Sequence, residues 1–243
     1  MRFKSFFIAS SIVLGLTQLC YGQAGTIVGS KHDFSLANNT WNFSTPVTAQ
    51  LQGQICRPCH APHNSNIRDV AAIGGGYSNT PGAGSFGPLW DHTLSTQTYN
   101  IYSQGYNFWK EGAATVGNPD GSSKLCLSCH DGTVALANFR TFATATTKMS
   151  TFNGGASNLG TDLSTSHPIS FTYNTALATT DHKIWDPSST PSGVHSGTID
   201  ADMLENGKLQ CISCHDAHNG AGVNRLLIKS NVGSALCFTC HKL

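Results

Sequence analysis

The sequence predicts a mostly irregular, coil-rich chain with short α-helices and few short strands, and two observations indicate this. Only 11% of the 243 residues are charged, Gly alone contributes 25, and regular hydrophobic periodicity is scarce over long stretches. Eight of the nine cysteines fall into four copies of one pentapeptide, C-x-x-C-H. A chain with so little apolar periodicity needs a core that its own side chains do not supply.

Helix signals surround three of the pentapeptide regions. Polar capping residues and a terminating Gly predict helices from Ser122 or Ser123 through His130, from Asp200 to Gly207, and from Ser234 through His241. A Val/Ile/Thr/Phe-type segment predicts a short strand at 169–173. Runs rich in Gly, Pro, Ser, Thr and Asn are expected to be loops, at 74–88, 144–166 and 174–200.

The spacing of the pentapeptide has a mechanical meaning. Residues i, i+3 and i+4 share one face of a helical turn, so two thiols and an imidazole point the same way. C-x-x-C-H attaches c-type haem: the thiols add to two vinyl groups while the imidazole reaches the iron. We therefore predict four haem c groups, which would also form the missing core. The covalent positions are Cys56, Cys59, Cys126, Cys129, Cys211, Cys214, Cys237 and Cys240, and the proximal iron ligands are His60, His130, His215 and His241.

Three other uses of paired cysteines account for the pattern less well. A thioredoxin-like dithiol needs one C-x-x-C in a βαβ context and no fixed His after it. Zinc ribbons and knuckles do not call for a His immediately after every second Cys. A disulfide framework explains the even count of cysteines but not the histidines.

The N-terminus carries an export signal. Arg2 and Lys4 precede an apolar stretch, and small residues follow at Gly22 and Ala24, so residues 1–22 are predicted to be a signal peptide cleaved after one of these two. Beyond residue 24 no apolar run is long enough to span a bilayer. We expect residues 23–243 to form one exported tetrahaem domain, extracellular or on the cell surface, with the periplasm as the alternative.

An internal duplication divides this domain into segments at about 50–140 and 205–243. Each half opens with C-x-x-C-H-x-x-H-N, at Cys56 and at Cys211, and closes with a simpler Leu-C-x-x-C-H, at Cys126 and at Cys237. The order is doubled and then simple, twice over.

The second axial ligand of each iron decides between electron transfer and catalysis. The whole chain has three methionines, so histidine is the favoured distal ligand, and the candidates are His32, His63, His92, His167 and His218. His63 and His218 each lie three residues after a proximal His and cannot reach the far side of their own haem, so we expect each to ligate a neighbouring one. His182 and His195 lie in a polar loop and are expected to be solvated.

The motifs together resemble the tetrahaem c-type cytochromes with doubled C-x-x-C-H motifs, in particular the extracellular filament-forming OmcE type of metal-reducing bacteria. The segments that carry the likeness are Gly-Ser-Lys-His-Asp, C-x-x-C-H-x-P-H-N, Pro-Leu-Trp-Asp-His-Thr, Leu-Cys-x-Ser-Cys-His-Asp-Gly, Ser-His-Pro-Ile-Ser-Phe and C-x-x-C-H-D-x-H-N. The resemblance implies bis-histidine haems and polymerisation through a histidine that ligates a haem of the next subunit. His32, in the N-terminal arm, is our candidate for that bridging ligand.

These observations favour an electron carrier over an enzyme. Its expected partners are identical subunits in a filament, redox partner cytochromes and extracellular acceptors such as metal oxides. Three alternatives stay open: a soluble periplasmic shuttle, an electron-donor subunit docked to a separate enzyme, and a multihaem oxidoreductase for a small oxyanion with one exchangeable iron position. The formal net charge of +1, without a basic patch, gives no support to nucleic-acid binding.

Overall fold

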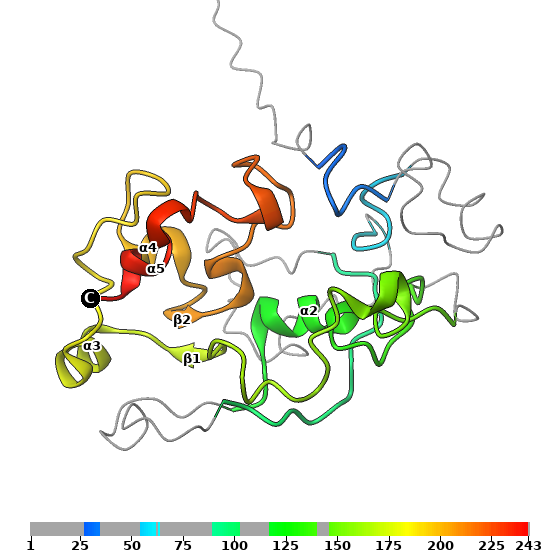
Figure 1. The fold of residues 1–243 in the computed structure, drawn as a ribbon, viewed down its shortest axis with the longest axis horizontal. Coiled ribbons are helices and arrows are strands. Elements are labelled where there is room, and N and C mark those ends of the chain that lie inside the picture. The colour runs from blue at the N-terminus through cyan, green and yellow to red at the C-terminus, as the bar shows by residue number, and fades with distance from the viewer. Residues whose placement is uncertain are drawn as a thin grey trace, which may run out of the picture.

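The computed structural model describes residues 27–34, 54–61, 63, 89–102, 117–139 and 146–242. Most of these residues are in turns and irregular backbone, with short helices and one two-stranded sheet (Figure 1). The predicted fold class, coil with short helices and few strands, is confirmed for this part of the chain. The predicted signal peptide at 1–22 and the predicted loop at 74–88 lie outside the described residues.

The regular elements are few and short. The α-helices are α2 (Gly121–His130), α3 (Thr175–Asp181), α4 (Ile199–Met203) and α5 (Cys237–Cys240). Short 3₁₀ turns are η4 (Phe152–Gly155), η5 (Cys211–Ser213), η6 (Asn224–Leu226) and η7 (Val232–Ser234). Strand β1 (Phe171–Thr172) pairs antiparallel with β2 (Lys208–Leu209), with Phe171 opposite Leu209. In Figure 1 this pair lies between α2 and the group formed by α3, α4 and α5.

Helix α2 confirms the predicted helix through His130 but begins differently. Its N-cap is Asp120, which has extended backbone (φ −126°, ψ −173°), and Ser122 and Ser123 are buried inside the first turn. The Asp120 carboxylate does not cap the helix, because it pairs with Lys208 next to β2. The first turn of α2 is therefore held by long-range contacts instead of a local cap.

The segment 174–200, predicted to be a loop, is partly helical. The Asn174 side chain accepts the Leu177 backbone N–H at 2.9 Å and so caps the start of α3. The sequence did not predict this helix, because the segment is polar and contains prolines. Thr198, not Asp200, caps α4 by accepting the Ala201 N–H at 3.4 Å.

The last two predicted helices are shorter than expected: the first ends before Gly207, and the second begins after Ser234. Helix α4 ends at Met203, before Gly207, because Leu204 is already extended (φ −100°, ψ 142°). Ser234 cannot cap the final helix, since its φ of 64° is left-handed and it closes η7 instead. Helix α5 consequently covers only the pentapeptide cysteines and their two intervening residues. The predicted strand at 169–173 is confirmed as β1.

Residues 171–236 build an ordinary hydrophobic core, which the sequence did not predict. The buried cluster contains Phe171, Tyr173, Leu177, Ala178, Ile184, Ile199, Met203, Leu209 and Leu236. Leu177 and Ile199 are 1% and 0% exposed. This cluster brings α3, α4, β1 and β2 together, so side chains hold the second half of the chain in addition to any bound group.

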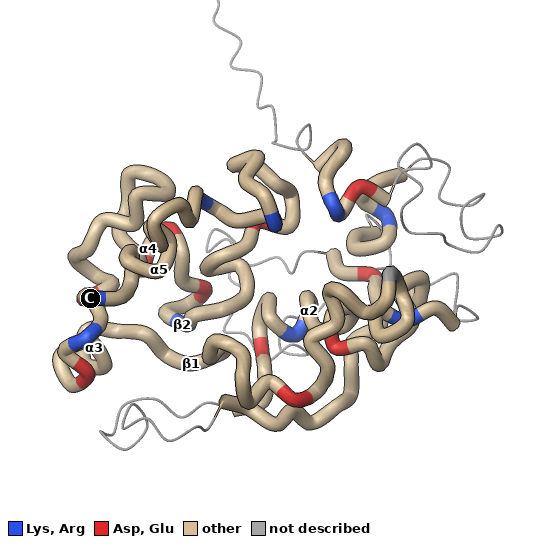
Figure 2. The backbone as a smooth tube through the Cα atoms, viewed as in Figure 1, with Lys and Arg blue, Asp and Glu red and all other residues tan. Residues whose placement is uncertain are grey.

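The rest of the described chain has smaller apolar clusters and scattered charge. Tyr99, Leu127 and Leu163 form one cluster beside α2. Figure 2 shows the acidic and basic residues dispersed along the described backbone without a face of one sign. Within the described residues, no helix has both the length and the hydropathy needed to cross a membrane.

Because of this core, we expect the effect of a Leu to Ala change on the free energy of unfolding to depend strongly on the burial of the leucine. Leu177→Ala removes a fully buried side chain and should lower the free energy of unfolding by about 2–5 kcal/mol. Leu159→Ala, at a leucine that is 51% exposed, should change it by less than about 0.5 kcal/mol. Denaturant unfolding of the purified protein measures both, and equal losses would contradict a core centred on α3.

Candidate haem-binding sites

All four C-x-x-C-H motifs adopt a single turn of helical backbone. The His60 N–H donates to the Cys56 carbonyl at 2.8 Å, and the same bond recurs from His215 to Cys211 at 3.0 Å and from His241 to Cys237 at 2.9 Å. The second motif lies at the end of α2, within the helical ladder. The shared turn places each pair of thiols and the following imidazole on one side of the backbone, as the spacing predicts.

The eight motif cysteines are all free thiols in the structure. None is engaged in a disulfide, although several lie close together. Unpaired thiols are the chemical form required for addition to haem vinyl groups.

Four imidazoles are oriented by the same kind of hydrogen bond through Nδ1. Nδ1 lies close to a backbone carbonyl oxygen in His130 (2.9 Å to Ser157), His215 (3.1 Å to Arg225), His32 (3.2 Å to Ala217) and His167 (2.8 Å to Pro168). A carbonyl only accepts, so Nδ1 carries the proton and Nε2 keeps its lone pair. Such bonds orient a histidine for binding a metal through Nε2.

Three histidine pairs lie at nearly the same separation, with interplanar angles of 43° for His130 and His32, 26° for His60 and His218, and 75° for His241 and His167. Each pair joins a motif histidine to a predicted distal one, and the ring centroids are 6.2 Å apart for His130 and His32, 6.1 Å for His60 and His218, and 6.3 Å for His241 and His167. A metal–imidazole bond is about 2 Å long and a ring nitrogen lies about 1 Å from its ring centre, so two imidazoles on opposite sides of one metal have centroids about 6 Å apart. The pairs fit axial ligation of one iron each.

The number of donors per site distinguishes haem from a bare metal. Within the described residues, no group of three or more His, Cys, Asp or Glu side chains is arranged to hold a metal ion. Structural zinc takes four protein ligands. A pair of opposed imidazoles suits a metal that brings its in-plane ligands with it, as haem iron does.

Burial lowers the pKa of two of these histidines. The pKa of His32 falls to about 4 because the ring is buried and faces His130. The pKa of His241 is lowered by burial and by His167. A neutral ring at neutral pH keeps the lone pair that a metal requires, so the low pKa favours ligation.

His215 and the remaining candidates are placed differently. His215 is exposed and has its Nδ1 bonded as described, but no opposed ring is found for it among the described residues. His63 is exposed. His92 is 1% exposed and faces no motif histidine; its nitrogens lie 2.9 Å from the Thr93 carbonyl and 3.1 Å from the Ala135 carbonyl. The Nε2 of His92 also lies 3.5 Å from the thiol of Cys129, so this ring adjoins the second motif through an attachment cysteine.

His182 and His195, expected to be solvated, are exposed. His182 ends α3 in the left-handed conformation, with φ 61°. Neither histidine faces a motif histidine in the described part of the chain, so both are suitable controls for changes at the paired rings.

Consecutive motifs are neighbours in space. The thiols of Cys126 and Cys211 share a hydrogen bond, which holds the pKa of Cys126 well above its usual value and lowers that of Cys211. Burial and the nearby Cys59 raise the pKa of Cys129. Burial and Cys214 raise the pKa of Cys240 to about 11. The first motif therefore adjoins the second, the second the third, and the third the fourth.

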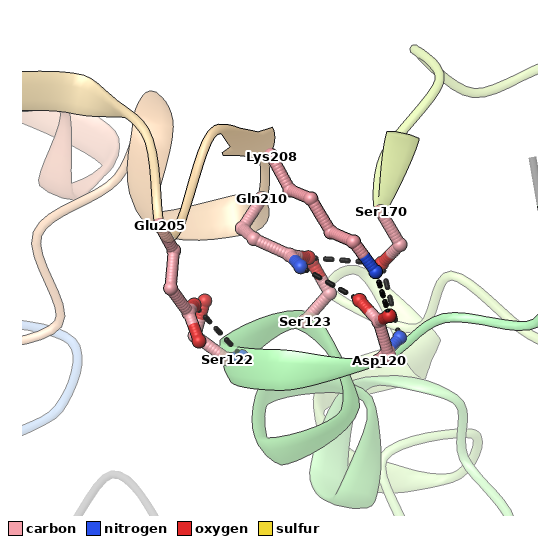
Figure 3. Close-up of polar contacts among 7 residues, drawn as sticks. All are labelled: Asp120, Ser122, Ser123, Ser170, Glu205, Lys208 and Gln210. Carbon is pink, nitrogen blue, oxygen red and sulfur yellow. Dashed lines mark hydrogen bonds and ion pairs between the residues drawn. The ribbon is translucent and has the colours of Figure 1, made fainter. Parts of the chain in front are cut away.

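A cluster of polar side chains joins the second motif to the third. We call it the central polar cluster; its members are Asp120, Ser122, Ser123, Ser170, Glu205, Lys208 and Gln210 (Figure 3). It connects the first turn of α2 to β2 and to the residue before Cys211. Sequence reasoning treated Ser122 and Ser123 only as helix caps, and no local pattern identifies their partners, which lie more than eighty residues away.

Comparison with known proteins agrees with the motif analysis. Residues 204–243 match a family model described as a doubled CXXCH motif, and this segment contains the third and fourth pentapeptides. A search of curated proteins gives no match. The doubled motif indicates covalently bound haem c in a multihaem c-type cytochrome that transfers electrons.

Gly121 offers a test of the contact between α2 and the third motif. Its φ is +51°, and an added Cβ would lie 2.8 Å from Glu205 Oε1 and 2.9 Å from Gln210 Nε2. Gly121→Ala should therefore destabilise the protein by about 1–3 kcal/mol. Gly117→Ala, where nothing lies within 4 Å of the added Cβ, is the control. Thermal unfolding measures both, and an unaffected Gly121→Ala would contradict this packing.

Proposed function

We propose that this protein is a tetrahaem, bis-histidine c-type cytochrome that transfers electrons outside the cell. The observation that carries the proposal is the opposition of three motif histidines to three other histidines at 6.1–6.3 Å between ring centres. Each haem would cycle its iron between ferric and ferrous states. The protein's part is to attach, orient and space the groups.

The structure supports a specific distal ligand for three of the four irons. His32 would complete the site of His130, His218 that of His60, and His167 that of His241. The pairing of His218 with His60 joins the two doubled motifs. The two doubled motifs are copies of one pattern, and His218 of the second pairs with His60 of the first. By the same relation His63 of the first would ligate the iron of His215 in the second, and we assign it as the fourth distal ligand.

Two protein ligands on each iron favour an electron carrier over an enzyme. Axial imidazoles on both sides leave no exchangeable position at which a substrate could bind. The alternative, a multihaem oxidoreductase for a small oxyanion, needs one iron with a replaceable ligand, and the His215 site is the place to look for it. A soluble periplasmic shuttle would have the same four sites and differ only in location and assembly.

Export and assembly into a filament complete the proposal. The basic, apolar and small-residue regions of 1–22 support export, and the resemblance to filament-forming cytochromes supports assembly of identical subunits. Redox partner cytochromes and extracellular acceptors such as metal oxides would supply and remove electrons. His32 opposes His130 of its own chain here, which favours a role within the subunit over the bridging role expected from its position.

Single histidine changes test the ligand assignments. The parent should contain four low-spin haems, and His218→Ala, His32→Ala and His167→Ala should each convert one of the four to high spin because one axial bond is lost. Haem content, absorption and electron paramagnetic resonance spectra measure this. His182→Ala should leave all four low-spin. A high-spin haem in the parent would favour the oxidoreductase.

Electron microscopy of extracellular fractions tests the filament. Ordered filaments of the holoprotein are expected, and His32→Ala should still assemble if His32 serves its own subunit. Monomers alone, with four low-spin haems, would instead identify a soluble shuttle. Loss of filaments specifically in His32→Ala, with the His182→Ala control still assembling, would restore the bridging role of His32.

A further inference from the structure

The central polar cluster is concentrated at one place, the contact between the second and third haem motifs. Ser123 and Gln210 are 0% and 1% exposed. Ser123 lies on α2 one turn before Cys126, and Gln210 directly precedes Cys211. The two residues therefore connect the backbone segments that carry the adjacent thiols of Cys126 and Cys211.

Ser123 makes two hydrogen bonds across this contact. Its hydroxyl donates to Gln210 Oε1 at 2.5 Å and accepts the Cys211 backbone N–H at 3.0 Å. The attachment residue of the third motif is thus bonded directly to the helix that carries the second. A shift of α2 relative to Cys211 would break both bonds.

Gln210 extends the connection to a third segment. Its Oε1 also accepts from the Ser170 hydroxyl at 2.9 Å, and its Nε2 donates to Asp120 Oδ1 at 2.8 Å. Asp120 is in turn paired with Lys208, and its backbone N–H donates to Ser170 Oγ at 3.0 Å. Both ends of the Gln210 amide are therefore fixed by partners that are themselves hydrogen-bonded (Figure 3).

Glu205 fixes the start of α2 from the opposite side. It is 8% exposed, and its Oε2 accepts the Ser122 backbone N–H at 3.0 Å. Burying so many polar groups costs free energy, the more so because Glu205 Oε1 and Ser122 Oγ have no hydrogen-bond partner among the described residues, and apolar side chains could fill the same volume at less cost. A hydrogen-bonded network favours one defined arrangement of the segments that it joins, here α2 and the segment before Cys211.

We propose that the central polar cluster fixes the segment that carries Cys126 and Cys129 against the segment that carries Cys211 and Cys214, so that haems attached to these cysteines would be held as neighbours that exchange electrons directly. This inference rests on the proposed function. His130 and His215 would hold the two irons, and the haems would supply one-electron exchange in which no bond forms or breaks. Ser123 and Gln210 act as positioning residues.

Two variants of the holoprotein test the positioning role. Ser123→Ala removes both bonds of the hydroxyl, and Gln210→Glu keeps the side-chain shape but replaces the donor to Asp120 with a second carboxylate oxygen. Both should retain four low-spin haems. Both should lose part of the Soret circular-dichroism couplet that coupled haems produce, and electron exchange between the second and third haems, followed by nuclear magnetic resonance, should slow.

Ser192→Ala is the matched control. Ser192 is 1% exposed, its hydroxyl donates to Asp202, and it accepts the Val194 backbone N–H at 3.0 Å, so it makes the same kinds of bond as Ser123 away from this contact. The Soret couplet and the electron-exchange rate of Ser192→Ala should match those of the parent protein. A change in Ser192→Ala as large as that in Ser123→Ala would indicate general loosening and would overturn the positioning role.

Failure of this inference can be told apart from failure of the proposed function. Fewer than four haems in the parent, or a high-spin haem, would count against the proposed function. Four low-spin haems with an unchanged couplet and exchange rate in both variants would overturn the positioning role alone. Should either variant not fold, a structure of the parent holoprotein decides: the inference fails if the second and third haems are not in direct contact.

Discussion

The separation of opposed imidazoles is the constraint around which the described part of this chain is arranged. Each pair brings together segments that are far apart in the sequence: His32 meets the end of α2, His218 meets the first motif, and His167 meets the C-terminal turn. Each separation is the distance expected between the centres of two imidazoles that share one metal. Backbone carbonyls hold Nδ1 of several of these rings, so the rest of the fold serves to aim Nε2.

The chain meets this constraint by different means in its two halves. Residues 171–236 pack nine buried side chains into a conventional core, so their geometry follows largely from hydrophobic burial. Around α2 the apolar clusters are smaller, and the helix is fixed to the later half through serine, glutamine and carboxylate groups. Hydrogen bonds are directional where apolar contacts are not, and this suits the junction between two neighbouring attachment sites.

The sequence predicts the local features of the sites well because their chemistry is local. The turn at each C-x-x-C-H depends on five residues, and the strand at Phe171 depends on a short β-prone run. The sequence predicts that His218 serves a haem other than that of His215 but does not identify which one, and in the structure His218 lies 6.1 Å from His60 between ring centres. The core around Leu177 was not predicted, because its residues come from short segments without periodicity. The partners of Ser123 lie too far along the chain for any local signal. His92 is buried, as its apolar neighbours predict, and its role as a ligand stays a prediction.

The paired histidines also have a topological consequence. A group attached covalently through one motif and coordinated by a distant imidazole closes a long loop of chain, as a disulfide would. Such a cross-link acts mainly on the unfolded ensemble, whose conformational entropy it reduces, and the reduction grows with loop length. The loop 60–218 overlaps both the loop 32–130 and the loop 167–241, so restraining it would shorten the effective length of the other two. Each group would then carry electrons and also cross-link the chain, and its stabilisation would add to that of the hydrophobic core between residues 171 and 236.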